Sequence, residues 1–507
     1  MTVQTEFPIV GIGASAGGVE ALEGFFRGVP PKPGLAFVVL THLSPVRESH
    51  LPEVLQHYTG LKVQTATQDA EVLVDNVYVL PADAVMSIHE GRLRLRQRVP
   101  EQRGPRPIDL FFTSLALDRG EFSAGVVLSG GDSDGTLGIK AVKEQGGLTL
   151  AQSADGFGPS SPEMPGSAIA TGLVDFIVPA DQMGVKLVDF AAGLGHLDDL
   201  DDTAAQGPER GRLEAAKHEI YALLRARIGH DFSGYKSKTF MRRVQRRMHV
   251  NQMPTLNAYV EFLKQNSQEA GALFRDLLIS VTNFFRDAEA FESLQEQVIP
   301  QLLKDRGASE TIRLWVPGCA TGEEVYSLAI LLREHLDTLP AAPRVQVFAT
   351  DIDDRALAVA RAARYPAALL DGVSAERRER YFVADGDSYV VSKAVRDLCI
   401  FSPHNVLRDP PFSRIDLVSC RNLLIYFGGG IQKQVIPTFH YALRPGGYLF
   451  LGMSENVTQF NDLFSPIDKK HRIFQRRTDI GAQPRPTITL PSMHKPDLLH
   501  SCLLYTS

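Results

Sequence analysis

A short stretch near the start of the sequence combines glycines with a serine that could act as a nucleophile. The segment Gly11–Leu22 reads GIGASAGGVEAL and directly follows apolar residues. Glycines after a strand can let backbone N–H groups approach a phosphate. Alternatively, the pattern G-x-S-x-G can present Ser15 on a sharp turn as a nucleophile. In that case the helix opened by Gly17 and Gly18 would offer its free N–H groups to an oxyanion.

A serine becomes a nucleophile only beside a general base and an orienting acid. His42 directly follows the apolar run LAFVVLT, and Asp134 lies in LSGGDSDG after the run AGVVL, where Asp132 is a competing acid. Ser15, His42 and Asp134 therefore all follow expected strands, at the edge where parallel sheets form sites. Ala16 stands where a dinucleotide loop needs its third glycine, and the chain order differs from that of α/β-hydrolases. The first observation weakens a dinucleotide loop and the second disfavours the α/β-hydrolase fold, so from the residues alone a tight turn, a nucleotide loop and a serine nucleophile all remain open.

A second glycine turn lies much later in the chain. The segment LWVPGCATGEEVYSLAILL begins as an expected strand, turns through Gly318 and Gly322, and continues as a helix. The next expected strand, in VQVFATDID, ends at Asp351, where a carboxylate suits the hydroxyls of a ribose. Because the turn departs from G-x-G-x-x-G, the residues alone predict either a nucleoside-bearing cofactor or a simple turn.

A basic segment, TFMRRVQRRMHV, places four arginines opposite an apolar stripe of Phe240, Val244 and Met248. A solvated helix face is the default interpretation of such a charge run. Nucleic acid is an alternative, since arginine clusters bind phosphates, but no aromatic residues alternate with these arginines. The arginines are Arg242, Arg243, Arg246 and Arg247.

The alternation of β-rich runs with helical segments predicts an α/β fold with two doubly wound, mostly parallel sheets. A helical region is expected between them, and an acidic, Gly- and Pro-containing stretch reads as a linker. The expected strands are 9–12, 35–40, 77–80, 125–128, 148–150, 174–178, 312–316, 345–349, 397–401, 415–419 and 448–451. The expected parts are 1–193 (first α/β domain), 194–212 (linker), 213–300 (helical), 301–477 (second α/β domain) and 478–507 (disordered tail).

The bulk composition is that of an ordinary globular protein of 507 residues, with 44% hydrophobic and 22% charged residues and a net charge of −6. No apolar run approaches the ~20 residues of a membrane span, and the N-terminus lacks a signal-peptide pattern. Four scattered cysteines without C-x-x-C indicate reduced thiols rather than a disulfide framework or a zinc site. We therefore expect a cytoplasmic protein with no metal and no membrane insertion.

The motifs GIGASAGG, THLSP, LSGGDSDGTLG, LTLAQ and EMPGSAI, in this order, resemble the catalytic domain of the chemotaxis receptor methylesterase family (CheB) across 7–193. The resemblance implies that Ser15 is the nucleophile, His42 the base and Asp134 the acid. It implies hydrolysis of glutamyl methyl esters on receptors, with deamidation of glutamine left open. The family typically has Thr where this sequence has Ala16. Its usual phospho-receiver domain has no counterpart in the sequence, so we expect no activation by phosphorylation in cis.

The motifs ISVTNFFRD, SPHNVL, DLVSCRNLLIYF and LRPGGYLFLGMSEN follow the pattern of the chemotaxis receptor glutamate methyltransferase family (CheR) over about 213–477. The resemblance implies an S-adenosylmethionine-dependent methyltransferase with a small β-insert near 365–402 that can dock receptor tails. It implies that Tyr426 lies beside the reacting methyl and that Arg286 also holds the substrate carboxylate. The implied cofactor contacts are Ser280, Thr282, Arg286, Glu323, Glu324, Asp351, Asn405, Val406, Cys420, Arg421 and Asn422.

Together the two resemblances predict a bifunctional enzyme that methylates and demethylates the cytoplasmic domains of chemoreceptors. Sensor kinases or other signalling domains are further expected partners, and nucleic acid is not. The four arginines of the basic helix would then bind the acidic methylation helices of a receptor. Two alternatives remain open: a non-catalytic signalling scaffold that keeps both folds, and a hydrolase joined to a small-molecule or nucleic-acid methyltransferase.

Overall fold

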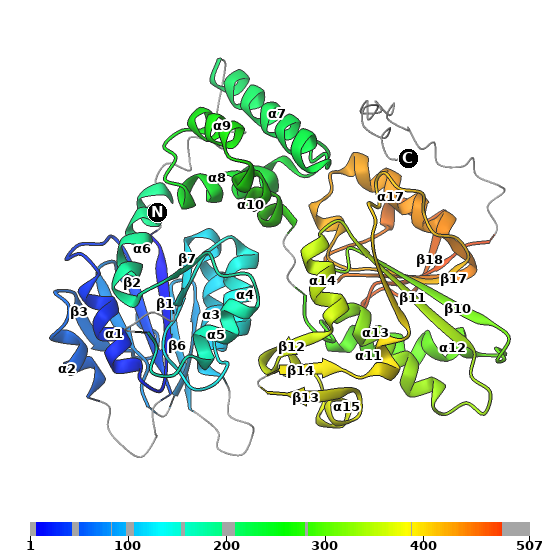
Figure 1. The fold of residues 1–507 in the computed structure, drawn as a ribbon, viewed down its shortest axis with the longest axis horizontal. Helices are drawn as coiled ribbons and strands as arrows, with labels where there is room; N and C mark the ends of the chain where they lie inside the picture. The colour runs from blue at the N-terminus through cyan, green and yellow to red at the C-terminus, as the bar shows by residue number, and fades with distance from the viewer. Residues whose placement is uncertain are drawn as a thin grey trace, which may run out of the picture.

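The structure is a computed structural model in which two α/β domains are connected through a group of helices (Figure 1). In Figure 1 the first α/β domain runs from blue to cyan, the helices are green, and the second α/β domain runs from lime to orange. The structure describes residues 7–42, 50–82, 84–97, 106–153, 158–194, 208–278, 282–386 and 388–478. Within these ranges, no helix is both long and apolar enough to cross a membrane.

The first sheet consists of seven parallel strands. Its strands are β1 (Ile9–Ala14), β2 (Ala36–Thr41), β3 (Lys62–Thr65), β4 (Asn76–Val79), β7 (Ser123–Val127), β8 (Leu148–Gln152) and β9 (Phe176–Val178). They lie in the order β3-β4-β2-β1-β7-β8-β9, and all neighbours pair in parallel. The chain winds outward in opposite directions from β1 and β7, which makes the space between them a switch point where such sheets place sites. Strand β3 was not predicted, because its four residues are exposed or half-buried and lack an apolar run.

Helices cover both faces of this sheet, as parallel strands require. They are α1 (Gly18–Arg27), α2 (Leu51–Gln56), α3 (Pro107–Arg119), α4 (Thr136–Gln145), α5 (Glu163–Ala170) and α6 (Ala180–Leu194), with a short 3-10 turn η1 (Gly120–Phe122) and a hairpin β5 (Ala84–His89) and β6 (Arg92–Gln97). Helices α1, α2 and α6 share one core with the sheet, and α3, α4 and α5 share the other. The last of these cores contains Phe111, Phe112 and Ile139, so α3 and α4 pack on the same face.

The green helices form a separate core above the two sheets (Figure 1). They are α7 (Pro208–Ile228), α8 (Ser237–Val250), α9 (Leu256–Gln265) and α10 (Ser267–Leu278). The stripe of Phe240, Val244 and Met248 on α8 is buried in this core, as its spacing predicts. Helix α7 already begins at Pro208, before the expected start of the helical region at 213; most of the expected linker, 195–207, lies outside the described residues.

The second sheet also has seven strands. They are β10 (Thr311–Pro317), β11 (Arg344–Asp351), β15 (Cys399–Pro403), β16 (Ile415–Cys420), β17 (Leu443–Leu451), β18 (Phe464–Asp468) and β19 (Ile473–Arg476). Their order is β15-β11-β10-β16-β17-β19-β18, and only the pairs made by β19 are antiparallel. Its switch point lies between β10 and β16. Strands β18 and β19 were not predicted, and β17 begins at Leu443 rather than at 448.

The remaining elements surround the second sheet or form a small insert. The helical elements are α11 (Ala288–Gln297), α12 (Ile299–Leu303), α13 (Glu323–Leu336), α14 (Asp354–Ala362), η3 (Ala367–Leu370), α15 (Ala375–Tyr381), α16 (Lys393–Arg396), η4 (Leu424–Tyr426), α17 (Gly429–Ala442) and η5 (Thr458–Phe460). The insert strands are β12 (Arg364–Pro366), β13 (Phe382–Asp385) and β14 (Ser388–Val391), which pair antiparallel in the order β12-β14-β13. The expected insert range of 365–402 is too long at its end, because β15 joins the main sheet.

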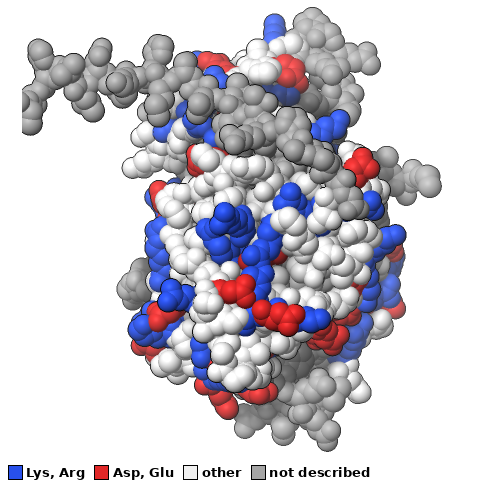
Figure 2. All heavy atoms as spheres, turned by 90° about the vertical axis from the view of Figure 1, so that its right-hand side faces the viewer, with Lys and Arg blue, Asp and Glu red and all other residues white. Residues whose placement is uncertain are grey.

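The surface of the second α/β domain carries charges of both signs. Figure 2 shows this side of the molecule with basic and acidic side chains interspersed among uncharged ones. Among the described residues, no three His, Cys, Asp or Glu side chains are arranged to hold a metal ion. The expected disordered tail, apart from Thr478, lies outside the described residues.

Candidate functional site

The first candidate site joins Ser15, His42 and Asp134 at the switch point of the first sheet. Ala14 is paired with Thr41 in the parallel register of β1 and β2, so Ser15 and His42 leave the sheet at the same level. The Oγ of Ser15 lies 3.3 Å from Nδ1 of His42. The Nε2 of His42 lies 2.8 Å from Oδ2 of Asp134. The three side chains therefore form one continuous hydrogen-bonded chain.

The acid of this chain is held as a carboxylate by its hydrogen bonds. Asp134 is buried, and its Oδ2 also accepts a bond from the N–H of Ile108, while its Oδ1 accepts from the N–H groups of Asp109 and Gly135. Burial alone would raise the pKa of Asp134, but the bonds from His42 and these N–H groups outweigh burial and lower it. An ionised Asp134 can orient the His42 ring and stabilise its protonated form.

Two neighbouring aspartates play different parts. Asp109 is buried, and burial followed by the charge of Asp134 raises its pKa well above its usual value. Asp132 is half exposed; its Oδ2 lies 3.3 Å from Nδ1 of His42, on the side of the ring that faces Ser15. Of the two acids that the sequence left open, Asp134 is therefore the one opposite the serine.

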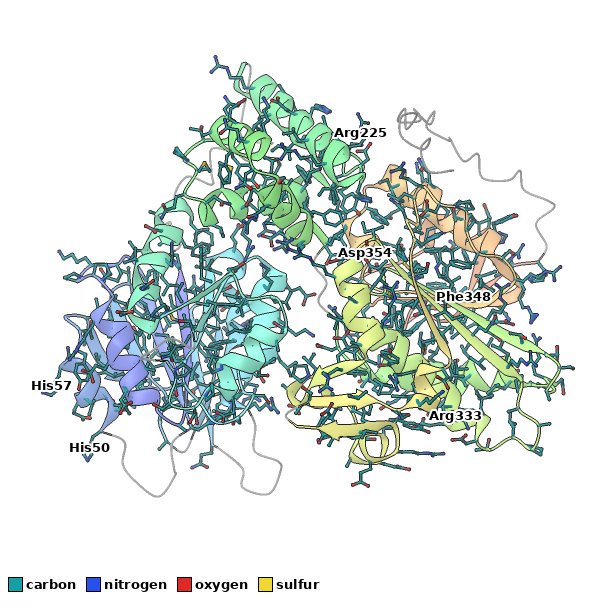
Figure 3. All side chains as sticks on the ribbon, in the orientation of Figure 1. His50, His57, Arg225, Arg333, Phe348 and Asp354 are labelled. Carbon is teal, nitrogen blue, oxygen red and sulfur yellow. The ribbon has the colours of Figure 1, made fainter. Side chains whose placement is uncertain are left out.

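The histidines of helix α2 lie away from this chain. His50 and His57 are labelled in Figure 3 at the outer edge of the first α/β domain, on the side away from the second domain. The Nδ1 of His57 lies 2.7 Å from the main-chain oxygen of Glu53 in its own helix. Neither histidine is placed to act on Ser15.

The turn after Ser15 needs glycine at position 17. Gly17 has φ of 69°, and a Cβ there would lie 2.6 Å from Cβ of Ser160. The N–H of Gly18 donates to the main-chain oxygen of Ser15 at 2.9 Å, so the expectation that it serves an oxyanion is wrong. Among the described residues, the N–H groups of Ala16 and Gly17 meet no acceptor, and they are the donors left at this turn.

The second candidate site is a cavity at the switch point of the second sheet. It contains about 930 Å³ of empty space, part of it open to solvent. It brings together most of the residues that the sequence predicted for the cofactor and the acceptor. These are Thr282, Arg286, Glu324, Asp351, Asn405, Val406, Arg421, Asn422 and Tyr426.

Three predicted cofactor residues are not placed in this cavity. Glu323 points elsewhere: its Oε2 accepts a bond from Oγ1 of Thr321, and its Oε1 lies 3.7 Å from Nζ of Lys140. Neighbouring residues on a helix are turned about 100° from each other, so Glu324 enters the cavity and Glu323 does not. Cys420, at the end of β16, is buried in a hydrophobic core. Ser280 lies outside the described residues.

The parallel register of β10 and β11 positions Asp351, as the register of β1 and β2 positions Ser15. Pro317 is paired with Thr350, so the loop after β10 and the end of β11 lie side by side. The Oδ2 of Asp351 accepts a bond from the N–H of Ala320 at 2.8 Å, and its Oδ1 accepts from the N–H of Asp353 at 2.9 Å. Burial raises the pKa of Asp351, while these bonds oppose the rise. The carboxylate lines the cavity with lone pairs that a pair of ribose hydroxyls could use.

Arg421 adds a second feature that fits a polar nucleoside ligand. Its guanidinium packs between the rings of Phe291 and Phe450, at 5.0 and 4.8 Å from their centres, and Nη2 donates to Asp287 at 2.6 Å. Its Nε is buried and has no hydrogen-bond partner among the described residues. Buried donors are rarely left unpaired in proteins, so a ligand acceptor would fit here.

The helical region supplies two cavity residues that sequence reasoning missed. His230 and Tyr235 come from the turn between α7 and α8 and line the cavity. The Nδ1 of His230 lies 3.1 Å from Nδ2 of Asn405, and the ring of Tyr235 packs edge-on against Phe427 at 5.3 Å. Burial lowers the pKa of His230 to about 4, so the ring is neutral at physiological pH. The available sequence signal was the aromatic turn HDFSGY, which joins two helices.

Glu455 holds the loop that carries several cavity residues. Its buried carboxylate accepts bonds from the N–H groups of Asn422, Leu424 and Gly452, at 2.9, 2.7 and 2.8 Å. Asn422 has φ of 60°, a conformation that costs energy for a residue with a side chain. Glu455 therefore stabilises a strained loop and is a further functional residue that sequence reasoning missed.

Tyr426 and Arg286 meet a side chain of the first domain. The Oε1 of Glu144 lies 3.0 Å from Nη2 of Arg286. Burial, followed by the charge of Glu144, raises the pKa of Tyr426 to about 12, so the phenol is protonated. The two residues predicted for the acceptor therefore both line this cavity, and a glutamate of the first domain lies beside Arg286.

Two of the four arginines predicted to bind a substrate are buried between the domains. Arg243 donates to the main-chain oxygens of Lys143 and Glu144, and Arg246 pairs with Asp175 and with Asp276. The side chain of Arg246 is only 3% exposed. Helix α8 is covered on both faces, so these arginines hold the two domains together rather than facing solvent.

The other two arginines are also paired. Arg247 forms a two-pronged ion pair with Glu269 at 2.9 and 2.6 Å and is mostly buried. Arg242 is the most exposed of the four, with 48% of its side chain accessible, and pairs with Glu121 of the first domain. The expected arginine surface for a receptor is therefore not presented in this arrangement.

Comparisons with known proteins match both halves of the chain. The family described as CheB methylesterase matches residues 10–187. The all-alpha domain of CheR methyltransferase matches 218–278, and its SAM binding domain matches 280–473. The matched ranges coincide with the first sheet domain, the helical group and the second sheet domain. The predictions of the two families and of the fold class are confirmed.

Individual proteins are similar to the whole chain or to parts of it. An uncharacterized 104.1 kDa protein in the hypE 3'region of Rhodobacter capsulatus is 36% identical over 469 residues, which are 87% of this chain and 49% of that protein. This chain thus spans about half the length of that relative. Chemotaxis protein methyltransferase 1 of Pseudomonas aeruginosa is 36% identical over 202 residues, 38% of this chain and 73% of that protein. The crystal structure of the CheB methylesterase catalytic domain of Thermotoga maritima is 28% identical and covers 36% of this chain and 99% of its own, with a TM-score of 0.34.

The cofactor prediction follows from the same match, because the domain that contains the cavity is the S-adenosylmethionine-binding domain of its family. The cavity residues fit such a ligand through Asp351 at the strand end and the unpaired Nε of Arg421. The chain belongs to the CheR methyltransferase family and carries a CheB methylesterase domain ahead of its CheR domains.

Proposed function

We propose that this protein both removes and adds methyl groups on glutamate side chains of chemoreceptors. The observation that carries the proposal is the hydrogen-bonded chain from Ser15 through His42 to Asp134, on the same polypeptide as a cavity that fits a methyl donor. The two reactions oppose each other, so the receptor's methylation level would reflect the ratio of two activities on one chain.

In the esterase half, Nδ1 of His42 takes the proton of Ser15 while Oγ attacks the carbonyl carbon of the glutamyl methyl ester. The N–H groups of Ala16 and Gly17 stabilise the oxyanion that forms. His42 then gives its proton to the leaving oxygen and methanol departs. Water repeats the sequence on the acyl-enzyme and frees the glutamate. Asp134 stays ionised throughout and keeps Nε2–H of His42 directed towards itself.

In the transferase half, S-adenosylmethionine supplies a methyl group that its sulfonium already activates, so the protein needs mainly to position and desolvate the reactants. Asp351 binds the ribose hydroxyls, and Arg421 and Asn405 offer polar groups around the ligand. Arg286 binds the acceptor carboxylate. The protonated hydroxyl of Tyr426 lines the acceptor side and donates a hydrogen bond there.

The partners proposed are the cytoplasmic domains of chemoreceptors, and the reduced cysteines fit a cytoplasmic protein. Since the arginines of α8 are buried or paired within the chain, we assign receptor docking to the β12–β14 insert, whose Val383 is an exposed apolar residue of 60% accessibility. A non-catalytic scaffold and a methyltransferase for small molecules or nucleic acids are the competing functions.

One experiment separates these functions. The protein is incubated with S-adenosylmethionine labelled in its methyl group and receptor cytoplasmic fragments, and base-labile label on receptor glutamates is counted. Premethylated fragments are incubated in parallel and the methanol released is measured. Ser15→Ala should abolish methanol release and leave labelling intact, whereas Asp351→Asn should do the reverse. Absence of both products from the unaltered protein would contradict the proposal and favour the scaffold.

A further inference from the structure

Helix α4 of the methylesterase domain lies against the rim of the methyltransferase cavity. Leu137, Lys140 and Glu144 are spaced so that they share one face of the helix. Leu137 packs on the hydrophobic core of the methyltransferase domain. The Nζ of Lys140 donates to the main-chain oxygen of Thr282, a cavity residue, at 2.6 Å. This face of α4 therefore brings its last turn to the acceptor side of the cavity.

Glu144 is held at this place from both ends. Its main-chain oxygen accepts a bond from Nη2 of Arg243 at 2.7 Å, which satisfies one of the carbonyls left free at the end of a helix. Its carboxylate is paired with Arg286 at 3.0 Å, and both side chains are 26% exposed. A partly buried carboxylate with an anchored backbone has few positions open to it, so it stays beside Arg286 rather than moving through solvent.

Under the proposed function, the residues near Glu144 are those that bind the acceptor carboxylate. Arg286 is the residue that would bind a substrate glutamate, and Tyr426 lies near enough for the charge of Glu144 to act on its hydroxyl. Both line the cavity that fits S-adenosylmethionine. Glu144 is not itself one of the residues that line this cavity, but its carboxylate is paired with the arginine that a receptor glutamate would need.

We propose that Glu144 is a methyl acceptor for the methyltransferase domain of its own chain. This inference rests on the proposed function of that domain. A carboxylate oxygen of Glu144 forms a bond to the methyl carbon of S-adenosylmethionine, the bond from that carbon to sulfur breaks, and its electron pair stays on sulfur. The products are the neutral methyl ester and S-adenosylhomocysteine, and no proton moves.

The reaction would have a structural consequence. The ester has lost the negative charge that pairs with Arg286, so this arginine becomes available for the carboxylate of another acceptor. Unmethylated Glu144 competes with receptor glutamates for the site, and methylated Glu144 does not.

The first test follows methyl transfer in the full chain without any receptor. The Ser15→Ala chain, which cannot hydrolyse esters, is incubated with S-adenosylmethionine labelled in its methyl group, and the tryptic peptide carrying Glu144 is examined for base-labile label and the added mass of one methylene. Label on this peptide is expected, at a rate per molecule that does not change on dilution. Glu144→Gln should abolish it. Glu121→Gln should leave it intact, since Glu121 is a matched control on the same first domain that pairs with Arg242 of the helical group and has 27% of its side chain exposed.

A second test uses binding alone. Sinefungin carries an ammonium group where S-adenosylmethionine has its methylsulfonium, and S-adenosylhomocysteine is neutral there. Glu144→Gln should lower the affinity for sinefungin several-fold more than the affinity for S-adenosylhomocysteine in calorimetry, whereas Glu121→Gln should change neither. An unchanged ratio would place the carboxylate away from the donor and overturn the proposal.

A parallel reaction with receptor fragments separates this inference from the proposed function. Label on receptor glutamates without label on the Glu144 peptide would overturn the inference and leave the function standing. Label on neither would overturn both. A rate that rises in proportion to protein concentration would show transfer between chains and would overturn transfer within one chain.

Discussion

Replacement of Asp134 by asparagine is the sharpest test of the esterase site. All four positions around the carboxylate are occupied by N–H donors: Oδ2 faces His42 and the N–H of Ile108, and Oδ1 faces the N–H groups of Asp109 and Gly135. An asparagine amide must direct its NH₂ at one of these two sets. If the NH₂ takes the place of Oδ2, it can bond His42 only when Nε2 has no proton. The proton is then on Nδ1, which faces Ser15 and can no longer accept its proton.

The size of the effect follows from this tautomer. The amide replacement of the acid in a serine protease triad lowers kcat about 10⁴-fold for the same reason, which corresponds to about 5 kcal/mol of the activation barrier at about 1.36 kcal/mol for each tenfold. If the NH₂ instead takes the place of Oδ1, two backbone donors lose their acceptor, at about 1–3 kcal/mol for each unsatisfied buried group. We therefore expect Asp134→Asn to lose esterase activity by about 10³–10⁴ and to lower the free energy of unfolding of the first domain.

The assay is the release of methanol from premethylated receptor fragments over a range of substrate concentrations, with the thermal midpoint measured in parallel. Asp132→Asn is the matched control. The carboxylate of Asp132 also lies near the His42 ring, with Oδ2 at 3.3 Å from Nδ1, but the side chain of Asp132 is half exposed. This variant should lose less than about tenfold, since an exposed ion pair contributes about 1 kcal/mol or less. Activity of Asp134→Asn within tenfold of the unaltered protein, or a larger loss in Asp132→Asn, would refute the assignment of the acid.

Four further predictions test other parts of the structure. Asp351→Asn should weaken the binding of S-adenosylmethionine by roughly 10- to 100-fold, which is the range for a lost charge-assisted hydrogen bond. Titration calorimetry would measure this loss of affinity, and methanol release by the first domain should stay unchanged. Gly17→Ala should sharply reduce esterase activity, because Cβ would enter the space of a neighbouring side chain at a φ of 69°; a normal rate would contradict the turn geometry. Arg246→Met removes one of the two cations that pair with the buried Asp175 and Asp276 and leaves them only Lys143, which should cost up to about 3–5 kcal/mol and loosen the first domain from the helical group, as domain-resolved hydrogen exchange would show. Burial opposes the ionisation of Asp175, but the charges of Arg246 and Lys143 outweigh burial and lower the pKa of this carboxyl group. The ionised Asp175 therefore stabilises the fold above its ordinary pKa of 3.8, and this stabilisation is lost as the pH falls below that value. A thermal midpoint that stays level from pH 5 to about pH 3 would contradict this direction.

Much of the fold and of both sites could be predicted because their signals are local. Apolar runs of strand length mark β1, β2, β7, β10 and β11, and in a parallel sheet the residue after each strand lies at the same edge. That is sufficient to place Ser15, His42 and Asp134 together and to place Asp351 beside a glycine turn. The family motifs then predicted the two families and the cofactor, which the family matches confirm. The strands of the two main sheets that were missed, β3, β18 and β19, are short or lie at a sheet edge, where the apolar pattern is weak, and the hairpin β5–β6 was missed as well.

Other features depend on which surfaces pack together. The spacing of Arg243 and Arg246 on α8 is that of an ordinary solvated face, and only the packing of the methylesterase domain buries them. His230 reaches the cofactor cavity because the helical group folds over it. Glu144 reads in the sequence as a common charged residue near the end of a helix.

The sequence by itself determined the two α/β domains, the residues at the strand ends and the family of each domain, because strand periodicity and short motifs need only neighbouring residues. The tertiary structure alone decided three other points: that Asp134 rather than Asp132 faces the far side of the His42 ring, that Arg243 and Arg246 of α8 are buried against the first domain, and that Glu144 pairs with Arg286 of the second α/β domain. Such contacts join residues that lie far apart in the sequence, 92 positions for His42 and Asp134 and 142 for Glu144 and Arg286, and no local pattern records them, since they arise only when folded surfaces exclude water from one another.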